Sequence, residues 1–449
     1  MTLEQYKQFI NNKNVAVVGI GVSNLPLIDF LLGCGANVTA CDKKERAEIE
    51  ETAKHLEGKG VTLKLGSEYL SDLDADVIFK SPGIRPDIPE FEAARKAGAT
   101  VTSEMELFFE ICPCEIIAVT GSDGKTTTTT LICEMLKKEG FTCHIGGNIG
   151  KPLVADVESM SAEDKVVLEL SSFQLFTMRK SPKIAVITNV TPNHLDWHKD
   201  YDEYIEAKKN IMKYQTGTDI LITNSANDIS KEIGTQAKGE WRCFSSKSDA
   251  RVHLENNAIF FGDEKIINIS DIKIPGAHNV ENYMAAIAAV RDYVSNETIE
   301  YVAKNFGGVE HRIEFVREVG GVKFYNDSIA SSPTRTMAAL NSFDKKLILI
   351  AGGYDKKIPF DGLGAKVNEK VKELVLVGHT AEKIKTAVEA AGNETKITVC
   401  SEFEQAVLTA YNKAKPGDVV ILSPACASFD LFPNFMIRGE KYKEIVNNI

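Results

Sequence analysis

Apolar runs followed by glycine turns and amphipathic stretches recur along this chain. The run Ile116–Val119 leads into a turn of small residues and then into a helical pattern that closes at Gly140. This order predicts a strand, a turn and a helix. The same order begins at Asn14, where an apolar run meets Gly19 and continues through a helical pattern to a second apolar run ending at Asp42.

The rest of the chain repeats this alternation. A helix is expected over NVENYMAAIAAVRDYV, residues 279–294, after the Pro275-Gly276 pair, and a hairpin is expected to turn at Gly320-Gly321. A polar stretch, residues 225–274, predicts a small β excursion. Buried strands are expected at VVLEL, IAVITNV and DILITN in the centre, and at KLILIAGG, ELVLVGH, TKITVC and DVVILSPACAS near the end.

Alternating strands and helices predict an α/β protein with mainly parallel sheets. We expect three domains: a Rossmann-like N-terminal domain, a central P-loop ATPase-type parallel sheet and a C-terminal Rossmann-like domain. Their expected bounds are 1–107, 108–308 and 309–449.

Composition and charge limit the classes of partner that the chain is expected to bind. The net charge of −11 disfavours nucleic acid and anionic lipid as partners, because both need a basic field. The polar start MTLEQYKQFI has no signal-peptide core, and no segment approaches the ~18 apolar residues of a membrane span. Nine cysteines, mostly in apolar runs, suit reduced thiols. We therefore expect a cytoplasmic protein that binds small molecules.

The turn TGSDGKTT has the parts of a phosphate-binding loop. Gly121 and Gly124 let backbone N–H groups approach phosphate oxygens, Lys125 supplies charge and Thr126 supplies a hydroxyl for Mg²⁺. The match to GxxxxGK[ST] is imperfect because Val119 stands at the first glycine. A strand before the turn and a helix after it still favour nucleotide binding.

Two further strand ends carry polar residues. Glu169 ends the VVLEL strand, where a Walker-B-type magnesium ligand belongs. His194 follows the next strand, in the crevice of the predicted sheet. His194 and His198 are four residues apart, but the glutamate of HExxH is absent, which disfavours a zinc protease.

The first glycine turn resembles a dinucleotide fingerprint, but Asn24 replaces the third glycine of GxGxxG. NAD is therefore disfavoured. A different diphosphate nucleotide could bind at the helix start, with Asp42 accepting hydrogen bonds from a sugar or base. A Rossmann turn without a ligand is the alternative.

Eight motifs in order resemble the Mur ligases of peptidoglycan synthesis, and the resemblance covers nearly the whole chain. Within that family the chain is most similar to the members that add D-glutamate. The motifs are TGSDGKTTT, GGNIGKPL, LELSSFQL, NVTPNHLDWH, GAHNVENYMAA, HRIEFV, YNDSIASSP and LSPACASFDLFPNFMIRG.

This resemblance implies a monomeric ligase that joins D-glutamate to UDP-N-acetylmuramoyl-L-alanine and splits ATP. It implies an acyl-phosphate intermediate, because phosphorylation gives a carboxylate a good leaving group. It also implies two Mg²⁺ ions and a CO₂-derived carbamate on Lys208, with Lys209 as the alternative. A carbamate requires a neutral amine, so Lys208 should be desolvated.

The resemblance also implies residue roles. The catalytic residues would be Lys125, Glu169, His194 and Lys208, and the metal ligands Thr126, Glu169, His194 and Lys208. ATP would contact Gly121, Ser122, Asp123, Gly124, Lys125, Thr126, Thr127, Asn279, Asn282, Arg312 and Asp327. The UDP-sugar would contact Ser23, Asn24, Asp42, Gly83, Asn148, Ser171, Gln174 and His194, and D-glutamate would contact Ser331, Lys356, Ser428 and Phe435.

One departure concerns Ile329, where relatives often carry lysine, so that Lys356 must supply more of the charge for D-glutamate. Three other functions compete with the D-glutamate ligase. A sister ligase would add L-alanine or a diamino acid, a regulatory protein would bind nucleotide without catalysis, and an oxidoreductase would bind NADH rather than UDP. The run SPACASFDLF favours the D-glutamate enzyme, and the set from Lys125 to Lys208 weighs against loss of activity.

Overall fold

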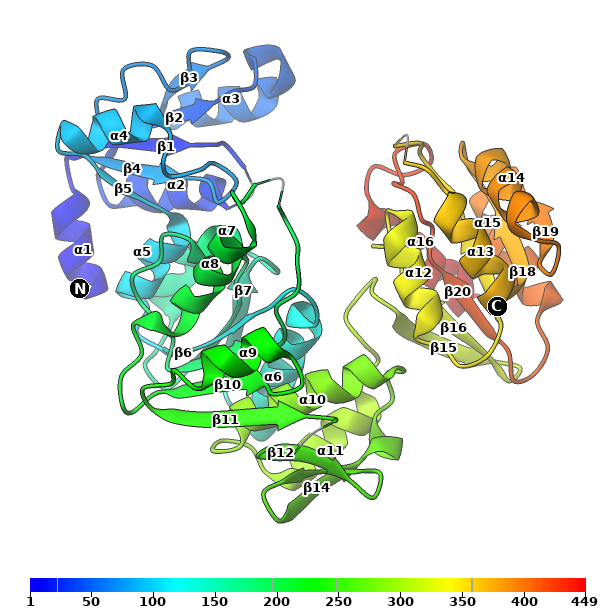
Figure 1. The fold of residues 1–449 in the computed structure, drawn as a ribbon. Coiled ribbons are helices and arrows are strands. Elements are labelled where there is room, and N and C mark those ends of the chain that lie inside the picture. The colour runs from blue at the N-terminus through cyan, green and yellow to red at the C-terminus, as the bar shows by residue number, and fades with distance from the viewer. Residues whose placement is uncertain (22, 196, 248, 357) are drawn as a thin grey trace. The chain divides into compact units, whose positions relative to one another are not determined.

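The computed structural model describes residues 1–449 except Val22, Asp196, Ser248 and Lys357. Three sheets with flanking helices form the chain, drawn in chain order from blue to red in Figure 1. Contacts divide the chain into two compact units. The first unit combines Met1–Asn268 with Glu281–Val302, and the second combines Ile269–Val280 with Ala303–Ile449.

The first sheet is wholly parallel and has the strand order β3-β2-β1-β4-β5. Alternate residues of β1 enter two different apolar cores, Val15 on one face and Ala16 on the other. A strand buried on both faces explains why its sequence is continuously apolar. The elements are α1 (Leu3–Ile10), β1 (Asn14–Val18), α2 (Asn24–Gly33), β2 (Asn37–Asp42), η1 (Arg46–Glu48), α3 (Glu50–Gly58), β3 (Thr62–Leu65), β4 (Val77–Lys80), α4 (Pro89–Lys96), β5 (Thr100–Thr102) and α5 (Glu104–Ile111).

The second sheet has nine strands in the order β14-β13-β12-β11-β10-β9-β6-β8-β7. It is parallel from β7 to β12, and β13 and β14 are antiparallel additions. The elements are β6 (Glu115–Thr120), α6 (Lys125–Glu139), β7 (Cys143–Gly147), η2 (Val154–Ser159), β8 (Lys165–Glu169), α7 (Ser172–Leu175), β9 (Ile184–Ile187), α8 (Tyr201–Lys213), β10 (Ile220–Asn224), α9 (Asp228–Gly234), β11 (Glu240–Ser245), β12 (Val252–Glu255), β13 (Ala258–Phe261), β14 (Glu264–Asn268), α10 (Ala277–Val290) and α11 (Asn296–Asn305).

Parallel pairing brings functional segments to one edge of this sheet. Strand β6 lies between β8 and β9, so the carboxyl ends of all three meet at the same edge. Ligands of open α/β sheets bind at such an edge. The expected β excursion is confirmed by two hairpins: β12–β13 turns at Asn256 and Asn257, with φ of 48° and 59°, and β13–β14 turns at Gly262, with φ of 58°.

The third sheet belongs to the second unit and has the order β15-β16-β20-β17-β18-β19, with only β15 antiparallel. The hairpin expected at Gly320-Gly321 is confirmed by the β15–β16 pair. The remaining elements are η3 (Ile269–Asp271), β15 (Glu314–Val319), β16 (Val322–Asn326), α12 (Pro333–Asn341), β17 (Leu347–Ala351), α13 (Asp361–Lys370), β18 (Val371–Leu376), α14 (Ala381–Ala391), β19 (Lys396–Val399), α15 (Phe403–Lys413), β20 (Val419–Leu422) and α16 (Phe435–Asn447).

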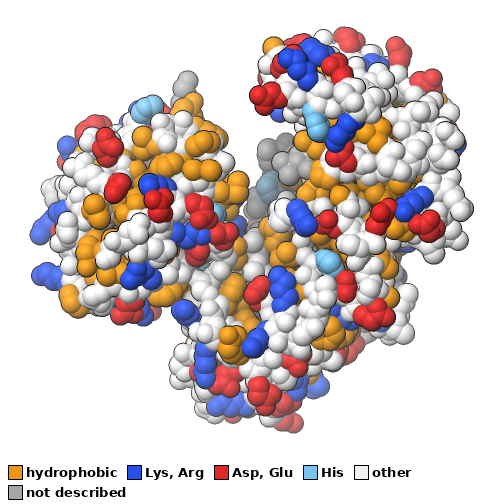
Figure 2. Space-filling view, turned by 180° about the vertical axis from the view of Figure 1, so that it is seen from behind, with side chains coloured by type: hydrophobic (Ala, Val, Ile, Leu, Met, Phe, Trp, Pro, Cys, Tyr) orange, Lys and Arg blue, Asp and Glu red, His pale blue; other side chains and the backbone are white. Residues whose placement is uncertain are grey.

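The surface agrees with the sequence's mixed charge. Figure 2 shows basic and acidic side chains interspersed on the face in view. Within the described residues, no helix combines the length and the apolar character that a membrane crossing requires.

Candidate active site

The glycine turn after β6 holds two glycines in backbone conformations that other residues rarely adopt. Gly121 has φ of +149° and Gly124 has φ of +78°. A Cβ on Gly121 would lie 1.9 Å from Thr188 Oγ1, and one on Gly124 would lie 2.4 Å from Asn282 Oδ1. Gly124 is also the N-cap of α6, where no described side chain caps the helix. The N-terminus of a helix attracts an anion such as a phosphate.

Two lysines converge on the carbonyl of this turn. Lys125 Nζ donates to Gly121 O and Ser122 O, both at 3.0 Å, and Lys208 Nζ donates to Gly121 O at 2.8 Å. Lys208 is only 2% exposed. Its pKa is lowered well below the ordinary value, first by burial and then by repulsion from Lys125. Lys208 Nζ also lies 3.5 Å from Thr120 Oγ1, and among the described residues no carboxylate forms an ion pair with it.

The neighbouring Lys209 has ordinary surroundings. Its side chain is 23% exposed, and its ammonium forms an ion pair with Glu206 at 2.8 Å. The structure thus separates two adjacent lysines that the sequence left as alternatives for the same role.

Glu169 ends β8 and is 1% exposed. Its Oε1 accepts a hydrogen bond from Asn148 Nδ2 at 2.8 Å, while Oε2 is buried without a described partner. Buried polar atoms are normally satisfied, and a carboxylate oxygen is a preferred ligand of Mg²⁺. The orphaned oxygen therefore fits a divalent cation at the strand edge.

Hydroxyl and amide groups fix the conformation of the glycine turn after β6. Ser122 Oγ donates to Thr191 O at 2.9 Å and lies 2.9 Å from Tyr204 Oη. Asp123 N donates to Asn189 Oδ1 at 2.9 Å. The first turn of α6 buries the two predicted ATP-binding residues Thr126 and Thr127.

The sequence reasoning did not single out Tyr204. Its ring lies 4.6 Å from Lys208 Nζ, and the two residues are four apart on α8. Helical spacing was the signal that could have found it, because residues i and i+4 share one face.

The two histidines after β9 have different surroundings. His194 is exposed, has φ of +54°, and places its ring 4.9 Å from that of Phe173. His198 is buried, and its Nε2 lies 3.0 Å from Ser172 Oγ. Of the two, His194 is the one that a ligand can reach.

The first glycine turn, after β1, is closed by hydrogen bonds that involve the side chains of Asn24 and Asp42. Asn24 Nδ2 donates to Gly19 O at 2.9 Å and to Ser81 Oγ at 3.2 Å. Asp42 accepts from the backbone N–H groups of Ile20 at 2.6 Å and Lys44 at 3.0 Å. Asn24 Oδ1 is buried without a described partner. An amide oxygen of this kind can accept a hydrogen bond from an uncharged ligand group.

The other residues predicted for the UDP-sugar have structural contacts too. Ser171 and Gln174 form the capping box of α7, with each side chain bonded to the other's backbone N–H. Gly83 O accepts from the Trp197 indole at 2.9 Å. Ser23 is the N-cap of α2 but makes no capping bond with its side chain.

The second unit holds most of the remaining predicted residues. Asp327 is buried, and it accepts from Ser423 Oγ at 2.6 Å and from Ile313 N at 3.3 Å. Burial raises the pKa of Asp327 to about 7. The same unit contains Asn279, Arg312, Ser331, Lys356, Ser428 and Phe435, whereas Asn282 belongs to the first unit.

These residues vary in exposure. Ser428 is 2% exposed, and Lys356 lies on the surface. Asn279 Nδ2 donates to Pro275 O at 2.6 Å. Phe435 opens α16, and its carbonyl accepts from Ser328 Oγ at 2.8 Å.

A buried arginine escaped the sequence reasoning. Arg438 is 2% exposed and donates to Ser328, Ala427 and Cys426 through its guanidinium. It lies within the NFMIRG motif, which was the available signal. Its contacts hold the segment before α16 in place.

Three family models match the chain, and together they span most of it. They are described as Mur ligase MurD-like N-terminal domain (residues 13–103), Mur ligase middle domain (119–290) and Mur ligase glutamate ligase domain (311–426).

Curated relatives match end to end. Proteins named UDP-N-acetylmuramoylalanine–D-glutamate ligase are 55% identical in Acetivibrio thermocellus, covering 100% of this chain and 99% of the relative, and 53% identical in Clostridium botulinum and Clostridium kluyveri, covering 99% of both.

Solved structures agree on the fold. The UDP-N-acetylmuramate-alanine ligase of Thermotoga maritima has a TM-score of 0.60 at 18% identity, over 97% of this chain and 100% of that one. A UDP-N-acetylmuramoyl-L-alanyl-D-glutamate–2,6-diaminopimelate ligase has a TM-score of 0.59 at 15% identity, over 98% and 94%. The predicted α/β architecture of three domains is confirmed, and the chain belongs to the Mur ligase family.

Proposed function

We propose that this chain is an ATP-dependent ligase that joins D-glutamate to UDP-N-acetylmuramoyl-L-alanine in peptidoglycan precursor synthesis. The observation that carries the proposal is the end-to-end identity of 53–55% with relatives named for that reaction. Its substrates are small molecules.

The chemistry explains the need for ATP. The carboxylate of the acceptor attacks the γ-phosphorus of ATP, giving an acyl phosphate and ADP. The amine of D-glutamate then attacks the acyl carbon, the bond to phosphate oxygen breaks, and amide, phosphate and a proton result. Groups that offset charge on the transferring phosphoryl group lower the barrier.

The groups around Gly121 suit this step. Lys125 would bind the β- and γ-phosphates, and the N-terminus of α6 would add backbone N–H donors. Together with Lys125, the proposed ATP contacts are Gly121, Ser122, Asp123, Gly124, Thr126, Thr127, Asn279, Asn282, Arg312 and Asp327.

Magnesium would be held by Thr126, Glu169, His194 and a modified Lys208, with two ions proposed. The orphaned oxygen of Glu169 fits this role. When bound, Mg²⁺ neutralises phosphate charge and orients the reacting oxygens.

A carbamate on Lys208 would turn a neutral buried amine into an anionic ligand. Burial and the lowered pKa of Lys208 support it, because only an unprotonated amine attacks CO₂. Wild-type protein in ¹³C-bicarbonate should show a carbamate carbon signal by NMR that is lost in Lys208→Ala and retained in the matched control Lys209→Ala. Short carboxylic acids should restore activity to Lys208→Ala. A signal unchanged in Lys208→Ala would exclude the modification there.

The remaining assignments are proposals of the same kind. The UDP-sugar would be bound by Ser23, Asn24, Asp42, Gly83, Asn148, Ser171, Gln174 and His194, and D-glutamate by Ser331, Lys356, Ser428 and Phe435. The domain bounds 1–107, 108–308 and 309–449, a monomeric state and a cytoplasmic location complete the proposal.

The test is phosphate release with UDP-N-acetylmuramoyl-L-alanine, ATP and Mg²⁺. Addition of D-glutamate should stimulate release strongly, whereas L-alanine and diaminopimelate should not. If D-glutamate stimulates no more than they do, the substrate assignment fails. An absence of ADP formation with every amino acid would reject ligase activity altogether.

A further inference from the structure

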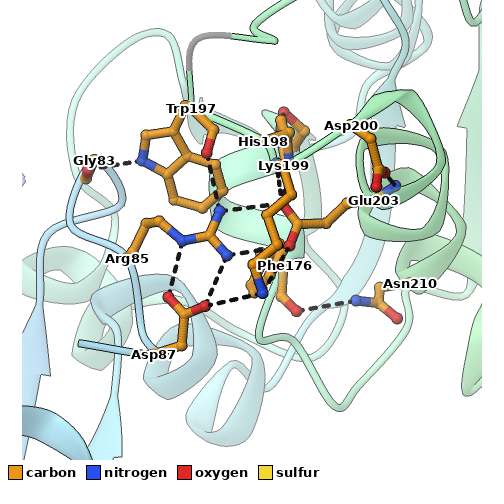
Figure 3. A network of polar contacts seen from close by, with 11 residues as sticks. Gly83, Arg85, Asp87, Phe176, Trp197, His198, Lys199, Asp200, Glu203 and Asn210 are labelled. Atoms are coloured by element: carbon orange, nitrogen blue, oxygen red, sulfur yellow. Dashed lines mark hydrogen bonds and ion pairs between the residues drawn. The ribbon is translucent and has the colours of Figure 1, made fainter. Parts of the chain in front are cut away.

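Arg85 connects the first sheet to the helix that carries Lys208. It lies in the loop between β4 and α4, two residues after Gly83. Its guanidinium reaches Glu203 in the first turn of α8, at 3.0 Å from Nη1 and 3.1 Å from Nη2. Figure 3 shows Arg85 between Asp87 and Glu203, with the Trp197 ring beside it.

All five N–H groups of this guanidinium are used. Nε and Nη2 each donate to Asp87 at 2.8 Å, and Nη1 donates to Trp197 O at 2.9 Å in addition to the bonds to Glu203. The guanidinium carbon lies 4.9 Å from the Trp197 ring and 5.4 Å from the Phe176 ring. These bonds fix both the position and the plane of the group.

Hydrogen bonds within the start of α8 also fix the position of Glu203. Its Oε2 accepts from Lys199 N at 2.9 Å, and its backbone N–H is capped by Asp200 Oδ1 at 2.8 Å. The hydrogen bonds from Arg85 lower the pKa of Glu203 to about 2, so the carboxylate is charged at neutral pH. Lys208 follows five residues later on the same helix, about 7–8 Å along its axis.

Trp197 forms a second link between the same two segments. Its indole N–H donates to Gly83 O at 2.9 Å, while its backbone carbonyl accepts from Arg85. Its backbone N–H donates to His194 O at 3.1 Å. The loop of Gly83 is thus tied to the His194 segment and to the start of α8.

We infer that Arg85 and Glu203 form a positioning latch that sets the loop of Gly83 relative to α8, and so places the acceptor's carboxyl at the phosphate loop. Neither residue needs to touch a substrate. This inference rests on the proposed function, because it concerns where the UDP-linked acceptor is held relative to Lys208 and Lys125.

The latch is not required to hold the two sheets together. One apolar cluster contains residues of both, such as Val15 and Leu168. Loss of one guanidinium should therefore leave the chain folded and change the position of a loop. Misplacement of reacting groups by about 1 Å can cost 10²-fold in rate.

The chain offers a matched control in Arg242. Its guanidinium is also bound to two carboxylates and one carbonyl, namely Glu240, Asp292 and Ala288 O. Glu240 and Arg242 lie on β11 of the second sheet, Ala288 lies on α10, and Asp292 follows the end of α10. Arg242→Gln removes an equivalent cluster that does not join the two sheets.

The experiment compares Arg85→Gln, Glu203→Gln, the double variant and Arg242→Gln. We expect Arg85→Gln to lower kcat/KM for the UDP-linked acceptor roughly 10- to 100-fold, with KM for ATP changed less than about twofold. The double variant should be no worse than Arg85→Gln, since both remove one interaction. Arg85→Lys, which keeps charge but loses the fork, should recover only part of the loss.

A second readout does not depend on activity. Hydrogen–deuterium exchange without ligands should rise in residues 81–88 and 199–208 of Arg85→Gln and Glu203→Gln, but not in Arg242→Gln. Unchanged exchange in residues 81–88 and 199–208 would overturn the latch. So would losses of kcat/KM that add in the double variant. The third contrary outcome is that Arg85→Gln and Arg242→Gln change the kinetic constants for the acceptor and for ATP to the same extent. If wild-type protein releases no phosphate with D-glutamate, the proposed function fails, and exchange alone still decides whether the latch exists.

Discussion

The chain contains two glycine turns of the same kind, and they differ in what they leave unsatisfied. Both follow a parallel strand and open a helix, after β1 at Gly19 and after β6 at Gly121. In the first, Asn24 and Asp42 bind the turn's own backbone. In the second, two lysine amines share the carbonyl of Gly121.

The buried oxygen atoms that lack a described hydrogen-bond partner near each turn differ in charge. The first turn leaves the amide oxygen of Asn24, and the second has the carboxylate oxygen of Glu169 nearby. A neutral oxygen suits a sugar or base, while a carboxylate beside two amines suits a metal and phosphates. We therefore expect one local fold to serve two ligand chemistries, with the buried amine of Lys208 making the second turn the less stable of the two.

The largest expected effect tests the charge of the second turn. Lys125→Ala should lower kcat by at least about two orders of magnitude. It removes the positive charge that would offset the negative charge of the transferring phosphoryl group. Lys137→Ala, in the last turn of the same helix, is the control and should retain activity. Near-normal turnover by Lys125→Ala in the phosphate-release assay would contradict the role.

The next largest effect is expected from loss of the hydrogen bond that Asn148 donates to Glu169. Asn148→Ala removes the amide that holds Oε1 and should raise the Mg²⁺ concentration for half-maximal activity about 10- to 100-fold. A Mg²⁺ titration of phosphate release measures it. An unchanged Mg²⁺ requirement would contradict the role of Asn148 in supporting Glu169, whereas its proposed contact with the UDP-sugar is measured separately, as a raised KM for the UDP-linked acceptor.

A stability measurement sharpens the comparison. The unfolded chain protonates Lys208 below a pKa of about 10.4, while the folded chain holds the amine neutral to lower pH. The free energy of unfolding is therefore highest above the pKa of the unfolded chain. It falls as pH drops below that pKa, because the unfolded chain binds a proton at Lys208 more readily than the folded chain does. Lys208→Met should therefore be inactive but have a higher melting temperature than wild type near pH 8.

Thermal melts in CO₂-free buffer give this difference directly. It should shrink as pH rises toward 10 to 11. If Lys208→Met is less stable than wild type at pH 8, burial of the Lys208 amine does not destabilise the fold.

The smallest expected effect lies in the first turn. Ser81→Ala removes a hydroxyl that donates to Val18 O at 3.1 Å and accepts from Asn24. It should destabilise the chain by about 1 kcal/mol, the usual net contribution of such a bond, while kcat is retained. A raised melting temperature would contradict our inference that the Ser81 hydroxyl stabilises this turn.

The sequence predicted the elements well because strands and helices follow local periodicity and turn chemistry. The strand before Gly121, the helix after it and the hairpin at Gly320-Gly321 all form where expected. The helix expected to run on toward Val294 ends at Val290 instead, and a new helix starts at Asn296. Element ends depend on packing as well as on local sequence.

The sequence by itself determined the strand–turn–helix units, the residue types at their ends and, through the order of its motifs, the family. Only the tertiary structure separated Lys208 from Lys209, paired Asn148 with Glu169 and brought Arg85 to Glu203. The reason is physical. Periodicity is a local property of a chain, whereas burial, charge pairing and an unsatisfied oxygen depend on residues that come together only when distant strands pair.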